Sequence, residues 1–338
     1  MHDLPWLLKP ADDFNERCAQ LADSLSPVDE VLALANAALT VNQSNRLYRA
    51  LQKLSAETRT VLSGTLTPFR LGIASNGTMD LMIPSMVTAA IRNGIDLEVI
   101  TADFGQVAQE AFDPVSKLNQ SHLDAVLLAL DYRAYPIFAG EFSSSNEKSL
   151  SNEALGYLQQ IRDSFTNYGG MICITQTLAC PPYELSGNFD AQLDGPLRRA
   201  LSEFNFALTE DVRTCADVML DIAVLANMVG VNQWFDERQW YMSRVPMANT
   251  FIPLYTEYLT KLIAALRGKS KKCLVLDLDN TLWGGVIGDD GLEGIQVGQG
   301  HPVGEAFLAI QQWVKALKDL GIIITICSKN EKNIALEA

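Results

Sequence analysis

The sequence is poor in histidine and in positive charge. It contains three histidines in 338 residues, too few to make a histidine-built metal site the favoured interpretation. Its 26 lysine and arginine residues face 40 aspartate and glutamate residues, which gives a formal net charge of −14. Because non-specific binding of nucleic acid requires a positive field, this balance argues against a nucleic-acid partner.

Paired cysteines, a leader peptide and long apolar runs are also lacking. The six cysteines form no CxxC pair and show no regular spacing, so reduced, buried thiols are the preferred interpretation. The N-terminus has no charged start followed by a continuous apolar stretch, which a signal peptide requires. No apolar run approaches the length of a membrane span. We therefore expect a cytoplasmic protein with no membrane partner.

Length and composition predict a globular chain of two or three domains. The chain is 48% hydrophobic and 20% charged, which is typical of globular proteins. Residues 1–66 carry apolar side chains at helical spacing and predict a helical leader, which could dock a partner but is better explained by packing on the next domain. Residues 267–272 form a basic linker, interpreted as solvated, although it could meet an acidic partner.

Strand and helix patterns alternate over residues 67–266. The polar stretch 143–152 within this region is interpreted as a loop. Strands are predicted where continuous apolar runs occur, at residues 71–74, 97–101, 123–130 and 171–175. Strands separated by helices predict an α/β domain with a doubly wound, mostly parallel sheet.

The stretch 271–283 organises the C-terminal segment, residues 273–338. The apolar run 273–276 predicts a strand buried on both faces, and it ends in Asp277 and Asp279. Because side chains alternate along a strand, both carboxylates should converge on one spot at the sheet edge where ligands bind. Adjacent like charges are unfavourable unless a cation joins them or one is protonated. The pair therefore predicts either a magnesium site or a division of labour between nucleophile and general acid/base.

A second strand is predicted at residues 322–327, after an amphipathic helix that begins near Pro302. The glycine-rich residues 284–294 between the two predicted strands are interpreted as a loop close to the crevice. A strand–helix–strand unit has parallel strands, so Asp277 and Ser328 should become neighbours at one edge. The hydroxyl and nearby N–H groups at such a turn suit phosphate oxygens.

These motifs resemble those of the haloacid dehalogenase (HAD) superfamily. The apolar strand followed by Asp-x-Asp-x-Thr, residues 277–281, resembles its first motif, and Ser328 after the next strand resembles its second. The longer run 277–288 and the tetrapeptide 327–330 are similar to one branch, the FkbH-like proteins. The resemblance implies a partial HAD-like unit that holds the first two motifs.

The resemblance also implies a role for each motif residue. Asp277 would be the nucleophile that takes or positions the phosphoryl group, and Asp279 would be the acid/base. Magnesium would be held by the Asp277 carboxylate and the Asp279 main-chain carbonyl. The phosphate would be bound by three polar residues, Thr281, Ser328 and Asn330. Phosphoryl transfer needs little beyond charge neutralisation and positioning, which these groups would supply.

FkbH-like proteins dephosphorylate an acyl phosphate, 1,3-bisphosphoglycerate, and hold the glyceryl unit as a thioester. They pass it to the phosphopantetheine thiol of an acyl carrier protein in polyketide, peptide or glycan biosynthesis. The resemblance therefore implies a phosphorylated glyceryl donor and an acyl carrier protein as partners. Cys327 and Cys273 are the nearest candidates for the acyl thiol by sequence, although a buried structural cysteine is the preferred interpretation for either alone.

The order of elements in residues 67–266 resembles the SGNH hydrolase fold. An SGNH esterase needs a serine after the first strand, where Ser75 lies, and a late Asp-x-x-His. This sequence has Asp236 in that motif but Gln239 in place of the histidine, and glutamine cannot act as a general base. The domain is therefore expected to lack esterase activity, while it could still bind a partner or an acyl group. Its histidine, His122, is interpreted as structural.

Polar and aromatic residues at the ends of predicted elements are candidates for such binding, with ordinary packing and capping as the equal alternative. These candidates are Asp131, Arg133, Trp234, Asp236, Arg238 and Trp240.

The C-terminal segment departs from the HAD pattern. The sequence ends at Ala338, before the lysine motif and the further acidic pair of the superfamily. We expect an uncovered helix stripe and sheet edge, and little turnover in isolation. A fragment, a second chain that supplies the rest, or packing on the middle domain would each explain this. Two further functions stay open: a general HAD phosphatase, or a non-catalytic module that binds a carrier protein.

Overall fold

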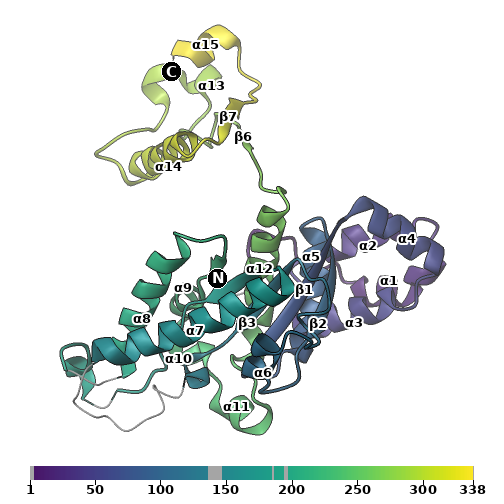
Figure 1. Cartoon of the computed structure of the whole chain (residues 1–338). Coiled ribbons are helices and arrows are strands. Elements are labelled where there is room, and N and C mark those ends of the chain that lie inside the picture. Colours follow the sequence, from purple (N-terminus) through teal and green to yellow (C-terminus); the bar gives the residue numbers. More distant parts are fainter. Residues whose placement is uncertain (1–3, 136–146, 185, 194–196, 338) are drawn as a thin grey trace. The chain divides into compact units, whose positions relative to one another are not determined.

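A computed structural model describes residues 4–135, 147–184, 186–193 and 197–337. The chain divides into two compact units, Met1–Gly268 and Lys269–Ala338 (Figure 1).

The first unit begins with a helical leader. Its four helices are α1 (Phe14–Gln20), α2 (Pro27–Ala35), α3 (Val41–Leu51) and α4 (Ala56–Thr65). A capping box starts α3: Thr40 Oγ1 accepts from Gln43 N–H at 3.3 Å, and Gln43 Oε1 accepts from Thr40 N–H at 2.9 Å. The buried faces of these helices form one apolar cluster that also contains Ile91 of the following domain. The leader therefore packs on that domain, which was the preferred of its two expected roles.

A sheet of five parallel strands follows, in the order β2-β1-β3-β4-β5. Its strands are β1 (Thr67–Ser75), β2 (Ile95–Thr101), β3 (Ala125–Ala129), β4 (Ile172–Gln176) and β5 (Val218–Leu220). The predicted α/β class is confirmed, and each of the four predicted strands overlaps an observed one. Parallel strands place their carboxyl ends along one edge, where ligands bind in such sheets.

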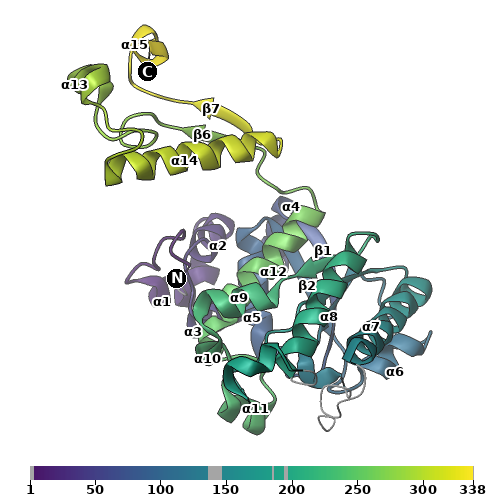
Figure 2. The same cartoon turned by 90° about the vertical axis from the view of Figure 1, so that its left-hand side faces the viewer.

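Helices cover both faces of this sheet (Figures 1 and 2). Alternation along β3 sends Leu127 into one core cluster and Val126 and Leu128 into the other. The first cluster includes α5 (Ile83–Arg92), α9 (Ile222–Val229) and α12 (Ile252–Leu266). The second includes α6 (Val107–Phe112), α7 (Glu147–Gly169) and α8 (Leu197–Val212). Two short helices, α10 (Val231–Trp234) and α11 (Glu237–Ser243), follow α9. None of the described helices combines the length and apolar character that a membrane crossing requires.

The polar stretch 143–152, predicted to be a loop, includes the beginning of a helix. Residues 143–146 lie outside the described part of the chain, but residues 147–152 are the first turns of α7. The loop prediction was wrong there because tertiary packing overrides weak local propensity. Ser151 is buried, and its hydroxyl donates a hydrogen bond to the Ala200 carbonyl oxygen of α8 at 3.1 Å.

The second unit holds a parallel pair of strands, as predicted from its strand–helix–strand pattern. Its elements are β6 (Cys273–Leu276), α13 (Ile287–Gly294), α14 (Pro302–Asp319), β7 (Ile323–Ile326) and α15 (Lys332–Glu337). The glycine-rich stretch interpreted as a loop contains α13, which is kinked at Gly291 with φ 68°. Figure 2 shows α14 running along the two strands.

The prediction that β6 and β7 are buried on both faces was wrong. Alternate residues of β6 are half-buried or exposed, and Val275 is 60% exposed. Ile323 of β7, the register partner of Cys273, lies on the same side of the strand pair as Val275 and is 63% exposed. Part of the α14 stripe is open as well, as expected, with Trp313 60% exposed. An apolar run indicates a strand, but it does not indicate whether a neighbour covers each face.

A buried ion pair ties three parts of the first unit together. Arg92, at the end of α5, lies with its Nη2 2.6 Å from Oε2 of Glu257 on α12, and these side chains are 8% and 1% exposed. The Arg92 Nη1 also donates to the carbonyl oxygens of Ala35 and Ala37, at 2.6 and 3.0 Å. Lys261 Nζ lies 3.2 Å from the other Glu257 oxygen. Each charge in this cluster therefore has close partners.

We predict that Glu257→Leu destabilises the first unit by roughly 3–5 kcal/mol, because it leaves the Arg92 charge buried without its counter-ion. The matched control is Glu210→Leu, which breaks an Arg213–Glu210 pair whose side chains are 72% and 54% exposed. That variant should change stability by less than about 1 kcal/mol. Urea unfolding followed by circular dichroism measures both, and equal losses would contradict the assignment.

Candidate functional site

Asp279 is fixed by three hydrogen bonds just beyond β6. Its Oδ1 accepts from the Trp283 indole N–H and from the Ile287 backbone N–H, both at 3.1 Å. Its Oδ2 accepts from the Asn330 side-chain amide at 2.9 Å. Asn330 follows β7, so this last bond joins the ends of the two strands. Trp283 and Ile287 are buried together with Leu278, which holds the two donors in place.

These bonds set the charge of Asp279. Desolvation raises the pKa of Asp279, but the hydrogen bonds donated by Ile287, Asn330 and Trp283 outweigh it, and the pKa is lowered. The carboxylate is therefore held in its ionised form at neutral pH. An ionised carboxylate can accept a proton as a general base.

Asp277 has a different environment from Asp279. Its side chain is exposed, and its Oδ1 accepts a hydrogen bond from the adjacent Leu278 N–H at 2.8 Å. Among the described residues it has no other hydrogen-bond partner. The sequence presents the two acids as equivalent. In the structure the Asp279 carboxylate is occupied by three hydrogen-bond donors, whereas the Asp277 carboxylate is largely open. Open carboxylate oxygens are what a nucleophile or a cation ligand requires.

The three predicted phosphate ligands lie in the two loops that follow β6 and β7. Ser328 Oγ accepts from the Asn330 backbone N–H at 3.1 Å, which leaves the hydroxyl proton available to a further acceptor. Asn330 is the residue that bonds Asp279. Thr281 is half-buried, and its N–H donates to the Leu278 carbonyl oxygen at 3.1 Å. Ser328 and Asn330 therefore share one turn, and the Asn330 side chain joins that turn to the Asp279 carboxylate.

The two candidate thiols are both exposed, so the expectation that they are buried was wrong. Cys273 begins β6, and Cys327 directly follows β7. The Cys327 N–H donates to the Leu276 carbonyl oxygen at 2.8 Å, which places Cys327 beside the start of the Asp277 loop. Cys273 begins β6 and lies about 13 Å from Asp277 at the usual rise of a strand. Cys327 is therefore at the edge of the strands that carries the acids, and Cys273 is at the other end.

The residues around Asp277 are suited to a magnesium ion that takes few ligands from the protein. Among the described residues, no group of three or more His, Cys, Asp or Glu side chains could hold a metal. Magnesium, however, commonly keeps several waters and uses one or two carboxylates together with substrate phosphates. An open Asp277 carboxylate matches that mode, and a closed cage of protein ligands is not formed by these residues.

In the first unit, Ser75 does lie at the carboxyl end of the first strand of the sheet. The side chain is 7% exposed, and its hydroxyl donates to the Ala129 carbonyl oxygen at 2.8 Å. The Ser75 hydroxyl oxygen itself accepts a hydrogen bond from the Gly77 N–H at 2.9 Å. The hydroxyl therefore ties β1 to β3 and shapes the following turn, which gives it a structural task.

The residues at the position of the SGNH Asp-x-x-His motif are also engaged in structural hydrogen bonds. Asp236 caps α11 by accepting from the Gln239 N–H at 3.0 Å. Gln239 Oε1 accepts from the Asn249 N–H at 3.2 Å. His122 is exposed in the loop before β3 and has φ 49°. These contacts agree with the expected absence of a Ser–His pair, which the sequence had already indicated at Gln239.

Three of the six candidate binding residues of this domain gather in space. Arg133 pairs with Asp131 and lies 4.0 Å from the ring centroid of Trp240. Trp234 instead belongs to the core, with its ring 6.0 Å from that of Phe251. Asp236 is the helix cap described above, and Arg238 is exposed.

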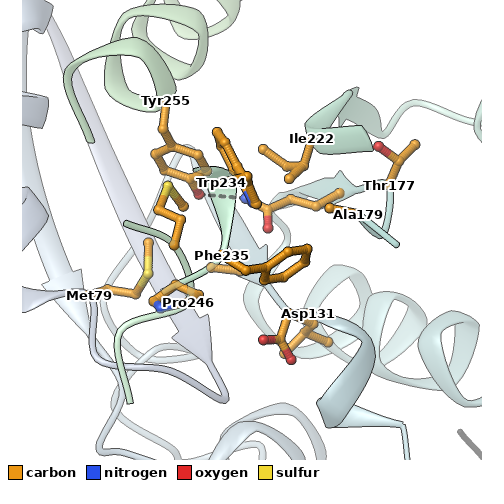
Figure 3. Close-up of a pocket in the computed structure, with 13 residues that line it drawn as sticks. Met79, Asp131, Thr177, Ala179, Ile222, Trp234, Phe235, Pro246 and Tyr255 are labelled. Atoms are coloured by element: carbon orange, nitrogen blue, oxygen red, sulfur yellow. Dashed lines mark hydrogen bonds between the residues drawn. The ribbon is translucent and has the colours of Figure 1, made fainter. Parts of the chain in front are cut away.

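A small cavity of about 30 Å³ lies beside Asp131 at the carboxyl edge of the sheet (Figure 3). The residues that line it come from the ends of β1, β3, β4 and β5 and from the segment around α10 and α12. They are Met79, Ala129, Leu130, Asp131, Gln176, Thr177, Ala179, Ile222, Trp234, Phe235, Pro246, Met247 and Tyr255. The sequence analysis missed Gln176 and Tyr255. The polar Gln176 at the end of an apolar strand was a signal, whereas Tyr255 lies in an ordinary helical stripe.

The comparisons with known proteins identify the family. The family described as "FkbH, N-terminal domain" matches residues 70–264. The chain belongs to the FkbH family. No curated protein sequence matches it.

One solved structure resembles this FkbH chain closely in shape. It is the N-terminal part of the protein BF1531 from Bacteroides fragilis, described as containing a phosphatase domain and as complexed with Mg. The two are 26% identical with a TM-score of 0.77, over 88% of this chain and 76% of that one.

Two enzymes align less well with the FkbH chain. An acetyl xylan esterase, AlAXEase, is 10% identical over 57% of this chain and 99% of its own, with a TM-score of 0.35. The salicylyl-acyltransferase SsfX3 from a tetracycline biosynthetic pathway is 15% identical over 60% and 55%, with a TM-score of 0.35. TM-scores this low do not establish a shared fold.

We predict that Asn330→Ala raises the pKa of Asp279 toward its ordinary value, because one of three donors is removed. A lowered folded pKa contributes stability that is present above the unfolded pKa and is lost as pH falls through the folded pKa. In the variant this loss should begin at higher pH. An NMR titration of the carboxyl carbon measures the shift, and Asn333→Ala, an exposed residue of α15, is the control. An unchanged titration of Asp279 would refute the role of Asn330.

We also predict that Gln239→His does not create esterase activity. The Ser75 hydroxyl would still be buried and donated to Ala129, so a histidine alone cannot activate it. Hydrolysis of p-nitrophenyl acetate by wild type and variant should equal the rate without protein. Serine-dependent turnover, lost in Ser75→Ala, would overturn this interpretation.

Proposed function

We propose that this FkbH protein is a HAD-type enzyme that dephosphorylates 1,3-bisphosphoglycerate and transfers the glyceryl unit to an acyl carrier protein. The observation that carries the proposal is the difference between its two acids. Asp279 is bound by three donors, while Asp277 is exposed and bonded only to the adjacent N–H among the described residues. One carboxylate is thus positioned for proton transfer, and the other is available to a phosphoryl group.

In the proposed phosphatase step, an Asp277 oxygen attacks the ester phosphorus, and the bond from phosphorus to the alcohol oxygen breaks. The leaving alkoxide takes a proton from solvent, and the ionised Asp279 accepts the proton of the water that then hydrolyses the aspartyl phosphate. The Ser328 hydroxyl and the turn around Asn330 would bind the phosphate oxygens. Magnesium, held by the Asp277 carboxylate and the Asp279 carbonyl, would neutralise phosphate charge.

In the proposed acyl step, a thiolate attacks the acyl carbon. The carbon–oxygen bond to the C1 phosphate breaks, and phosphate leaves with the electron pair. The resulting thioester then exchanges onto the phosphopantetheine thiol of the carrier, which releases the enzyme thiolate. Cys327 is favoured over Cys273 for this role because it lies at the acidic edge of the strand pair and is exposed, as a nucleophilic thiol must be.

We predict that the protein, given 1,3-bisphosphoglycerate, Mg²⁺ and a phosphopantetheinylated carrier protein, adds a glyceryl unit to the carrier, detected by intact mass. The rate should be low, because no third acidic side chain joins the pair among the described residues. Asp277→Asn should reduce phosphate release by at least about 100-fold, because the nucleophile is removed. Cys327→Ser should abolish carrier acylation and leave phosphate release, whereas Cys273→Ser, the matched control, should retain both.

The other outcomes separate the alternatives. Phosphate release without acylation by the wild type would indicate a general HAD phosphatase. A protein that binds the carrier but does neither would instead be a non-catalytic binding module.

A further inference from the structure

An open groove of about 550 Å³ lies in the helical leader and has no part in the chemistry proposed above. It runs between α1 and α3, which pack beside each other (Figure 1). Leu47 and Leu51 of α3 belong to the buried cluster of the leader and do not line the groove. The groove therefore occupies a different face of α3 from the one that packs on the rest of the unit.

Three cations line the groove along α3. Arg46 and Arg49 are one turn apart on this helix, and Lys53 follows just beyond its end, so the three span about 10 Å along the helix axis. All three side chains are exposed. None of them forms an ion pair among the described residues, whereas Arg17 of α1 lies 2.6 Å from Glu30. The groove thus carries a row of unpaired positive charges.

The sequence around this row holds no acid that could neutralise it. Residues 31–56 contain no aspartate or glutamate, although the chain has 40 acidic residues. Like charges one helical turn apart repel each other and destabilise the helix that carries them. The row is therefore a local positive region on a protein with a net charge of −14, and an anionic partner would relieve its repulsion.

Small side chains form the floor of the groove. Cys18, Ala19 and Ala50 line it, and Cys18 and Ala50 are only 4% and 7% exposed. Asn15 and Asn42 line it from the two helices and supply amide donors and acceptors. The distance at which helices pack depends on the side chains at their contact, and small ones permit a close approach. The groove can therefore receive a further helix.

The arrangement of the cations decides which anionic partner fits. A single small anion requires donors that converge on one point, whereas these cations are spread along a helix. A row of carboxylates matches them, and one face of an acidic helix carries such a row at the same spacing. The phosphates of a nucleic acid also form a row, but the net charge of −14 opposes the approach of a long polyanion.

We propose that this groove docks an acidic helix of a partner protein. Carboxylates at positions i, i+3 and i+7 of that helix face Arg46, Arg49 and Lys53, and its backbone lies over the small side chains of the floor. The proposal does not depend on the acid pair of the second unit or on the chemistry proposed for it.

The test uses the full chain and two fluorescently labelled helical peptides, each held in helical form by a hydrocarbon staple. One carries glutamate at i, i+3 and i+7 on an otherwise neutral face, and the other carries glutamine at the same positions. Fluorescence anisotropy measures binding at low salt. The glutamate peptide should bind roughly tenfold more tightly, which is the combined effect of three exposed ion pairs. Salt at about 0.5 M should remove most of this preference by screening.

Charge variants locate the binding site. The double variant Arg46→Gln and Arg49→Gln should lose the preference for glutamate. The matched control, Arg59→Gln with Arg238→Gln, removes two exposed arginines outside the groove and should retain it. In the reversed variant, Arg46→Glu with Arg49→Glu, a peptide with lysine at the three positions should bind more tightly than the glutamate peptide.

A change of shape tests the floor independently of charge. Ala19→Trp fills the groove and should weaken binding of the glutamate peptide at least about tenfold, because the helix can no longer approach α1 and α3 closely. Gln20→Trp, on the same helix but outside the groove, should leave the affinity unchanged. Circular dichroism confirms that each variant is folded.

Four results would overturn the proposal. They are equal binding of the two peptides by the wild type, no binding of either, an equal loss of preference in the control double variant, and an unchanged affinity in Ala19→Trp. Displacement of the glutamate peptide by millimolar inorganic phosphate would assign a small anion instead. Tighter binding of a single-stranded oligonucleotide than of the glutamate peptide would assign a nucleic acid.

Discussion

The buried pair of Arg92 and Glu257 is the constraint on which the first unit depends. Burying two opposite charges is unfavourable unless further hydrogen bonds compensate the lost hydration, and here two leader carbonyls and Lys261 supply such partners. The leader is therefore part of the domain, because it supplies acceptors that Arg92 would otherwise lack. The same pair fixes α12, and Tyr255 lies on α12 two residues before Glu257. The position of the phenol in the cavity thus follows from a salt bridge outside it.

Much of this architecture could be predicted from the sequence because it depends on local pattern. Apolar runs identified four strands of the sheet, and the strand–helix–strand pattern correctly indicated that β6 and β7 are parallel. The Gln176–Tyr255 pair could not be predicted in this way, because 79 residues separate its members and no periodicity links them. The exposure of Cys273 and Cys327 was missed for a related reason. A run of apolar residues indicates a strand but carries no information on which neighbours cover it.

The acid pair illustrates the same limit at the level of chemistry. The motif presents Asp277 and Asp279 as equivalent carboxylates, and a charge argument alone would let either one hold the proton. The structure distinguishes them through Trp283, Ile287 and Asn330, which all donate to Asp279. Ile287 belongs to the glycine-rich stretch 284–294, Trp283 directly precedes that stretch, and Asn330 follows β7. The stretch that resembled a loop therefore supplies one of the groups that separate the roles of the two acids.

The exposed acids of the second unit and the buried cavity of the first unit differ in how much water reaches them, and this difference limits what each can bind. Phosphate oxygens keep their hydration at an exposed site such as that of Asp277, but they would lose it in a narrow cavity walled by Trp234 and Phe235. The hydroxyl of Ser75 and the amide oxygen of Gln239 are held by backbone partners, so neither is free for hydrolytic chemistry in the first unit. The proposed phosphoryl chemistry therefore belongs to the exposed acids of the second unit and not to the cavity of the first.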